Sequence, residues 1–209
     1  MADDALTARA PFGGLAISAA PGNGVRVAER GGLALATVHV RRGQITALTE
    51  RVRARFGIEL PPGPHRRVAG DVAFAGIAPE AWLASSEEDS NGFARSLEAA
   101  IGDLASVADQ SSGYAVLRMT GPKLRETLAK ILPLDLHPRV FLPGDVASTI
   151  ASHVGATLWR LEDGADGSPV FEIAVFRSLA GSFWHCLASS AAEFGFARRE
   201  TLSSGMPNQ

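Results

Sequence analysis

The same order of elements, strand, helix, strands and helix, occurs twice along this chain of 209 residues and restricts the folds open to it. In the first half, the apolar spacing predicts elements at 33–40, 44–56, 68–77, 81–86 and 92–104, then a short strand near Val107. In the second half it predicts elements at 114–119, 122–132, 146–153, 156–161, 170–176 and 178–194. The turns between paired strands are too short for parallel crossovers. The sequence therefore predicts an α+β fold of two pseudo-repeated strand-helix-strand-strand-helix modules with mostly antiparallel sheets.

Composition divides the chain into three predicted regions. Residues 1–30 are rich in Ala, Gly and Pro and predict an extended N-terminal arm. Residues 31–199 hold the predicted elements and form one α+β domain of two modules, at about 31–107 and 108–199. Residues 200–209 predict a flexible tail for the same compositional reason.

Local signals predict how several helices begin and end. Ser90 or Asn91 can cap the second predicted helix, and Ser178 can cap the last one. Pro122 suits a first helical turn, where a missing N–H costs nothing, and Pro133 ends the same helix.

Charge and cysteine content narrow the class of protein. The formal net charge of −2 supplies no excess of Lys and Arg, so we expect no nucleic-acid partner. No apolar run reaches the roughly 20 residues that a membrane span needs, and no secretion signal opens the chain. A single cysteine, Cys186, excludes an internal disulfide. We therefore expect a cytoplasmic protein with no membrane partner.

Residues of the types used in catalysis and metal binding are present but do not form a recognisable site. The five histidines have no metal-ligand spacing. They are His39, His65, His137, His153 and His185. Cys186 adjoins the apolar stripe of a helix, where an inert thiol is expected, and Gly22 and Gly24 read as a turn because a third glycine is missing. We assign no catalytic, cofactor-binding or metal residues.

Several side chains have both a structural and a functional interpretation. Asp109 is expected to accept N–H groups in the turn that follows it, with a substrate contact as the alternative. The three tryptophans, Trp82, Trp159 and Trp184, are expected in the core, with a role as interface anchors as the alternative. The charge runs 65–67 and 87–89 are expected on the surface, where they can also act as docking charges.

Two motifs carry a family resemblance. The order Ala108-Asp109-Gln110-Ser111-Ser112, strand, Thr120-Gly121-Pro122-Lys123, helix is similar to the opening of the folate-binding fold of the glycine cleavage T-protein. The run Pro133-Leu134-Asp135-Leu136-His137-Pro138-Arg139-Val140-Phe141, followed by the strand at 172–175 and the closing helix, resembles the sarcosine oxidase gamma subunit family. The resemblance covers about residues 32–195.

The resemblance implies a non-catalytic assembly subunit of a four-chain enzyme. Such an enzyme oxidatively demethylates sarcosine to glycine, makes hydrogen peroxide and can form 5,10-methylenetetrahydrofolate. The resemblance implies alpha, beta and delta subunits as partners, with FAD, FMN, NAD, tetrahydrofolate and zinc held there and no cofactor in this chain. It leaves self-association of the isolated chain open.

The chain departs from the folate enzymes at residues 144–149, where no counterpart of their acid-bearing, glycine-rich strand follows Gly144. We also expect no counterpart of their additional carboxy-terminal domain. Independent aminomethyl transfer is therefore not expected. The alternatives are the corresponding subunit of N-methylglutamate dehydrogenase and a stand-alone folate-binding protein. An RNA-binding module is disfavoured by the negative charge and the single tyrosine, Tyr114.

Overall fold

A computed structural model describes residues 10–15, 22–88, 92–199 and 202–203. Its strands are β1 (Val25–Gly31), β2 (Ala34–Val40), β3 (Arg66–Ala69), β4 (Val72–Ala78), β5 (Ala81–Ser86), β6 (Ala105–Asp109), β7 (Tyr114–Thr120), β8 (Val146–Ala151), β9 (Val154–Arg160), β10 (Val170–Phe176), β11 (Phe196–Arg198) and β12 (Leu202–Ser203). Its helices are α1 (Ile45–Phe56), α2 (Phe93–Ile101), α3 (Leu124–Leu128) and α4 (Ala180–Ala191), with short 3-10 turns η1 (Arg177–Leu179) and η2 (Ala192–Phe194).

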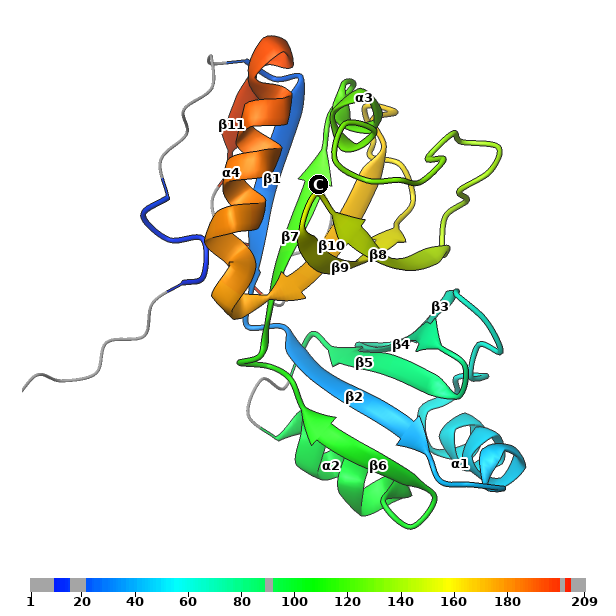
Figure 1. The fold of residues 1–209 in the computed structure, drawn as a ribbon. Helices are drawn as coiled ribbons and strands as arrows, with labels where there is room; N and C mark the ends of the chain where they lie inside the picture. Colours follow the sequence, from blue (N-terminus) through cyan, green and yellow to red (C-terminus); the bar gives the residue numbers. More distant parts are fainter. Residues whose placement is uncertain (1–9, 16–21, 89–91, 200–201, 204–209) are drawn as a thin grey trace, which may run out of the picture.

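The strands form two sheets that face each other (Figure 1). The first sheet has the order β3-β4-β5-β2-β6, and all its pairs are antiparallel. The second has the order β11-β1-β7-β10-β9-β8, with β12 also paired to β1. Among the described strands, only the pairs of β1 with β11 and β12 are parallel. The predicted α+β class with mostly antiparallel sheets is confirmed.

The two sheets have the same order of neighbouring strands, except that β1 occupies the place in the second sheet that β6 occupies in the first. The series β4-β5-β2-β6 in the first sheet corresponds to β9-β10-β7-β1 in the second. The last strand of the first module, β6, therefore lies beside β2, whereas β1 takes the matching place beside β7. The last strand of the second module, β11, pairs on the outer side of β1. The second sheet is thus completed by a strand from the amino-terminal side of the chain.

Helices cover the outer face of each sheet, so the layers run helix, sheet, sheet, helix (Figure 1). The helices α1 and α2 bury apolar side chains such as Leu48 and Leu97 against the first sheet. The helices α3 and α4 do the same against the second sheet, with Phe183 fully buried. Between the sheets, Leu83 of the first packs in one cluster with Trp159 of the second. In the described part of the chain, no helix is long and apolar enough to cross a bilayer.

Residues 25–30, which the sequence assigned to the extended arm, belong to strand β1 instead. Val25 and Val27 are buried in the core of the second sheet, so the strand is an integral part of the fold. Its three charged residues obscure the apolar alternation in the sequence, yet each forms an ion pair in the structure: Arg26, Glu29 and Arg30. Of the predicted tail, only residues 202–203 are described, and they form β12.

The predicted bounds of two elements are corrected. The single strand expected at 68–77 is the hairpin β3–β4, because Gly70 adopts a positive φ of 60° and turns the chain. The helix expected at 122–132 is regular only in α3, since bonds from Lys130 N to Thr127 O and from Ile131 N to Leu128 O tighten the chain after it.

Ser178 does not cap the last helix. It lies inside η1, and no side chain makes a capping hydrogen bond there or at the start of α4. The backbone of Arg177 is held instead by a bond from its N–H to Gly113 O. Ser90 and Asn91, the expected caps of α2, lie outside the described residues.

A buried ion network lies in the layer between the sheets and is centred on Glu172 of β10, which is only 2% exposed. Its Oε1 is 2.8 Å from Arg118 Nε of β7 and 2.9 Å from Arg30 Nε of β1. Its Oε2 accepts a hydrogen bond from Trp159 Nε1 of β9 at 2.9 Å. Both carboxylate oxygens are therefore paired, as a buried charge requires.

The same network reaches the first sheet. Arg30 also pairs with Glu87, which directly follows β5. Burial lowers the pKa of the Arg66 guanidinium on β3, while the carboxylates of Glu172 and Glu87 act in the opposite direction. The network therefore joins charged groups from both sheets in one layer.

Replacing Glu172 by Gln should strongly destabilise the fold. The change leaves Arg30 and Arg118 without their shared carboxylate, and an uncompensated buried charge costs about 3–5 kcal/mol. Urea titration followed by circular dichroism measures the free energy of unfolding. Glu162→Gln, at an exposed position, is the control and should change it by less than about 0.5 kcal/mol. Equal stability of the two variants would show that the network does not hold the sheets.

Replacing Phe12 by Ala should also destabilise the fold, although Phe12 lies in the region predicted as an arm. The ring is fully buried and lies 5.9 Å from the ring of Trp184 on α4. Truncating a buried phenylalanine costs about 3–5 kcal/mol. The same urea titration checks this, with Ala10→Ser at an exposed position as the control. An unchanged unfolding midpoint would mean that residues 10–15 do not pack on the core.

Candidate functional site

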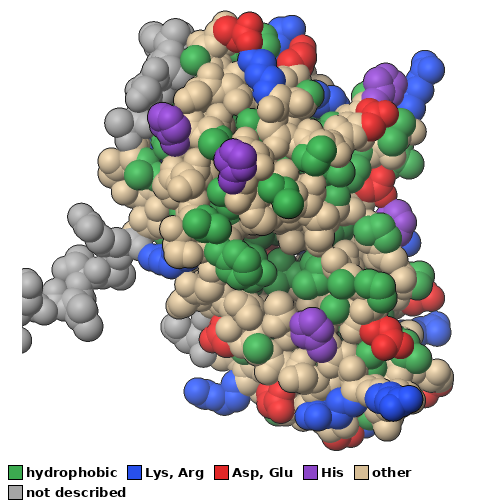
Figure 2. Space-filling view, viewed as in Figure 1, with side chains coloured by type: hydrophobic (Ala, Val, Ile, Leu, Met, Phe, Trp, Pro, Cys, Tyr) green, Lys and Arg blue, Asp and Glu red, His purple; other side chains and the backbone are tan. Residues whose placement is uncertain are grey.

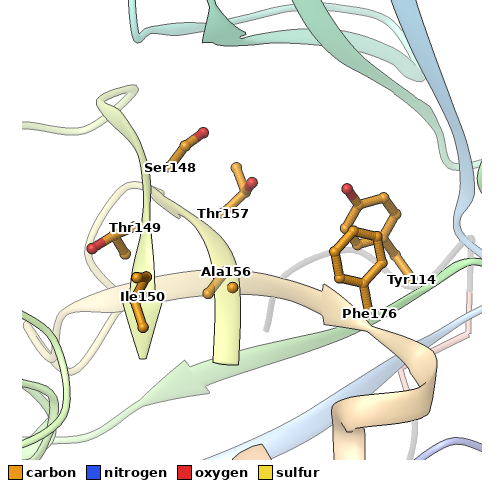
Figure 3. A pocket seen from close by; sticks show the side chains of 8 residues that line it. Tyr114, Ser148, Thr149, Ile150, Ala156, Thr157 and Phe176 are labelled. Carbon is orange, nitrogen blue, oxygen red and sulfur yellow. The ribbon is translucent and has the colours of Figure 1, made fainter. Parts of the chain in front are cut away.

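A groove lies at the open end of the space between the two sheets. Apolar side chains gather in the hollow between the two halves of the molecule (Figure 2). The groove has a volume of about 360 Å³. It is lined by Tyr114, Ser148, Thr149, Ile150, Gly155, Ala156, Thr157 and Phe176 (Figure 3).

An aromatic pair forms one side of the groove. Tyr114 begins β7 and Phe176 ends β10, and the two residues are direct cross-strand partners. Their rings stack with centroids 4.9 Å apart and planes inclined by 19°. Phe176 is still 48% exposed, so a large aromatic surface faces water at the mouth of the groove.

The hairpin β8–β9 forms the other side. Its tight turn places Ser152 at a positive φ of 55°, and the register brings Ser148 opposite Thr157 and Ile150 opposite Gly155. The hydroxyl of Ser148 donates to Ile77 O of the first sheet at 2.9 Å, which ties the hairpin across the space between the sheets.

The groove offers hydroxyl groups and apolar surface for binding. None of its described lining residues carries a charge at neutral pH, and burial raises the pKa of the Tyr114 phenol further above its ordinary value of 10.0. General acid–base catalysis needs a group whose pKa lies near the working pH, and the groove lining supplies none. The arrangement suits binding of an uncharged surface.

A smaller cavity of about 90 Å³ lies behind the aromatic pair. Glu29, Arg30, Ser111, Tyr114 and Arg177 are among the residues that line it. Glu29 is 5% exposed, and burial raises the pKa of its carboxyl, against the opposing effects of a backbone hydrogen bond at Phe12 and of Arg198. The cavity is too small for more than a few water molecules.

The raised pKa of Glu29 makes a pH-dependent stability test possible. Its protonated form favours folding, so that contribution is complete below about pH 4.5 and is lost as the pH rises through the raised pKa. Glu29→Gln cannot ionise. Its free energy of unfolding, relative to the original chain, should therefore increase between about pH 4 and about pH 7, measured by urea titration. A pH-independent difference would contradict the assignment.

The structure confirms the turn-capping role of Asp109. Its Oδ1 accepts the backbone N–H of Ser111 at 2.8 Å, and the side chain is exposed. The hydroxyl of Ser111 in turn bonds to both backbone groups of Leu35 on β2. The motif therefore fixes the crossing from the first sheet to the second.

The other singled-out residues are spread over the fold. All five histidines are exposed, and His65 pairs with Asp145 through Nδ1 and Oδ1 at 2.9 Å. No group of three His, Cys, Asp or Glu within metal-binding distance occurs among the described residues. Cys186 is half-buried against the core of the second sheet.

The three tryptophans are each 3% exposed, which confirms their place in the core. Trp82 Nε1 donates to Pro61 O at 2.9 Å, and Trp184 packs at an angle on Phe196.

The charge runs 65–67 and 87–89 were predicted to lie on the surface, and only some of their described residues do. His65 and Arg67 are exposed, whereas Arg66 is half-buried beside the ion network. Glu87 joins that network, Glu88 is exposed, and Asp89 lies outside the described residues.

Gly24 serves close packing at the start of β1. A Cβ there would lie 2.1 Å from Phe194 O, at the end of the last helix, so only glycine fits. Gly22 makes a similar approach to Gly195, where a Cβ would lie 2.9 Å from Cα. The two glycines thus shape the junction between the amino-terminal segment and the second module.

Two features of the structure were not predicted from the sequence. The Tyr114–Phe176 pair and the Glu172 network both depend on the register of β7 with β10. A partial signal existed, because Arg118 and Glu172 are single charges inside otherwise apolar strands.

Comparisons with known proteins agree with this geometry. The sarcosine oxidase, gamma subunit family matches residues 42–193. Sarcosine oxidase subunit gamma from Arthrobacter sp is 33% identical over 156 residues, which cover 73% of this chain and 76% of the relative. The same subunit from Corynebacterium sp. (strain U-96) is 30% identical over 148 residues, 69% of each chain.

Solved structures show the same relationship. A chain of heterotetrameric sarcosine oxidase from Corynebacterium sp. U-96, in complex with pyrrole 2-carboxylate, has a TM-score of 0.75 and 26% identity, covering 90% of this chain and 96% of that chain. The glycine cleavage aminomethyltransferase T from Bartonella henselae shares the fold, with a TM-score of 0.61 and 14% identity over 85% of this chain and 48% of that chain. On these matches, the chain belongs to the sarcosine oxidase gamma subunit family.

Proposed function

We propose that this chain is the gamma subunit of a heterotetrameric sarcosine oxidase and acts there as an assembly component without catalysis of its own. The observation that carries the proposal is its likeness, over nearly the whole of both chains, to a chain of the Corynebacterium heterotetramer. The uncharged lining of the groove supports the assembly role, because proton transfer at neutral pH needs titratable groups at the site.

The proposed complex is cytoplasmic and contains alpha, beta and delta subunits besides this chain. It demethylates sarcosine oxidatively to glycine, with formation of hydrogen peroxide and 5,10-methylenetetrahydrofolate. FAD, FMN, NAD, tetrahydrofolate and zinc are assigned to the partner subunits. The role of this chain is to present a rigid α+β surface to those subunits.

Co-expression with the alpha, beta and delta subunits of the same organism tests the proposal. We expect this chain to co-elute with them in size-exclusion chromatography at about 1 μM, and the purified complex to release hydrogen peroxide when sarcosine is added. The isolated chain should release none. A chain that elutes alone contradicts the proposal, and a complex that oxidises N-methylglutamate in place of sarcosine redirects it to that dehydrogenase.

Calorimetric titration of the isolated chain with tetrahydrofolate tests the remaining alternative. We expect no binding heat, because no described charged side chain lines the groove to meet the glutamate carboxylates of a folate. Saturable binding would assign folate binding to this chain and contradict the purely structural role.

A further inference from the structure

The long connection between α3 and β8 is irregular but firmly held. Leu136 and Phe141 are its buried anchors, at 4% and 8% exposure. The carbonyl of Leu136 accepts a hydrogen bond from Arg125 Nε at 3.0 Å, and that of Phe141 accepts one from Arg160 Nη1 at 2.6 Å. Arg160 is itself buried, so the loop is pinned to the interior at two points.

Bonds within the loop fix the segment around these anchors. The carbonyl of His137 accepts from the N–H groups of Val140 at 2.8 Å and Phe141 at 2.9 Å. Asp145 Oδ2 accepts from Leu142 N at 2.7 Å. The N–H of Arg66 on β3 donates to Gly144 O at 2.7 Å, which attaches the far end of the loop to the first sheet.

This rigid segment turns aliphatic side chains to water. Val140 is 58% exposed and Leu142 is 50% exposed, on either side of the buried Phe141. Pro138, Arg139 and Pro143 beside them are also exposed. We call Pro138, Arg139, Val140, Leu142 and Pro143 the loop surface. Because its shape is already fixed, covering it loses little conformational entropy and gains the burial of apolar area.

The charge of the loop surface indicates what covers it. Arg139 is its single charged residue. The nearby His137 accepts the backbone N–H of Arg139 on its Nδ1 at 3.2 Å, and the neighbouring Asp145 is paired with His65. Among the described residues Arg139 forms no ion pair, so the surface is apolar with one positive charge, and its complement is an apolar patch that carries a carboxylate.

We propose that the loop surface docks on another subunit of the sarcosine oxidase complex, at an apolar face whose acidic side chain pairs with Arg139. This inference rests on the proposed function. A second copy of this chain fits less well. A two-fold contact centred on the loop surface would bring two Arg139 side chains together, with no carboxylate on the surface to offset their repulsion.

Variants of the full chain, mixed with the separately purified complex of the other subunits, test this proposal. Leu142→Asp and Arg139→Glu should each raise the dissociation constant by about tenfold or more, measured by biolayer interferometry. Arg139→Lys, which keeps the charge, should bind nearly as the original chain does. Ile45→Asp, at a 37%-exposed aliphatic position on α1, is the matched control and should leave binding unchanged.

The outcomes separate this proposal from the proposed function. Since all changed side chains are exposed or partly exposed, their thermal unfolding midpoints should match that of the original chain, which excludes misfolding as the cause. If the original chain and all variants bind equally, the loop surface is not the docking site, while the proposed function stands. If the original chain does not bind, both proposals fail. Dimerisation of the isolated chain that Leu142→Asp abolishes would assign the surface to a second copy and overturn the proposal.

Discussion

The carboxylate of Glu172 lies out of water between two sheets, and the packing of both sheets depends on its neutralisation. Apolar side chains in the same layer, such as Leu83 and Trp159, attract without regard to direction. The hydrogen bond from Arg118 to Glu172 does have direction, and together with the ion pair between Arg30 and Glu172 it joins three neighbouring strands across one face. Through Glu87, the same network extends to the end of β5 in the other sheet. Stability thus comes mainly from apolar burial, whereas the charges contribute to the relative placement of the sheets.

This arrangement divides the molecule into an interior used for structure and surfaces left for recognition. The deep part of the space between the sheets is occupied by the ion network and the Trp159 ring, and the groove lies at the open end. Elsewhere on the molecule, backbone groups of the connection between α3 and β8 form hydrogen bonds within the chain, whereas the side chains of Val140 and Leu142 are exposed to water. Both features leave uncharged surface accessible at the outside of the molecule.

The success of the sequence-based predictions varied with the range of the interactions involved. Helix α1 and the turn at Asp109 depend on nearby residues, and the sequence predicted both. Strand β1 was missed because its charged side chains find their partners far along the chain. The prediction that Ser178 caps the last helix was wrong for the same reason, because the backbone N–H of Arg177 there donates to the carbonyl of the distant Gly113. The groove could not be predicted, because it needs the register of β7 with β10 and the hairpin that faces it.

The position of β1 also has a consequence for how the chain acquires its structure. The first sheet is built from one continuous stretch, so it can form as soon as that stretch leaves the ribosome. The second sheet pairs Val25 with Phe196, so its completion must wait until nearly the whole polypeptide has been synthesised. Until then the apolar face of β1 has no permanent cover. During synthesis of this chain we therefore expect a stage in which a strand that is buried in the finished protein is accessible to chaperones and to incorrect pairing.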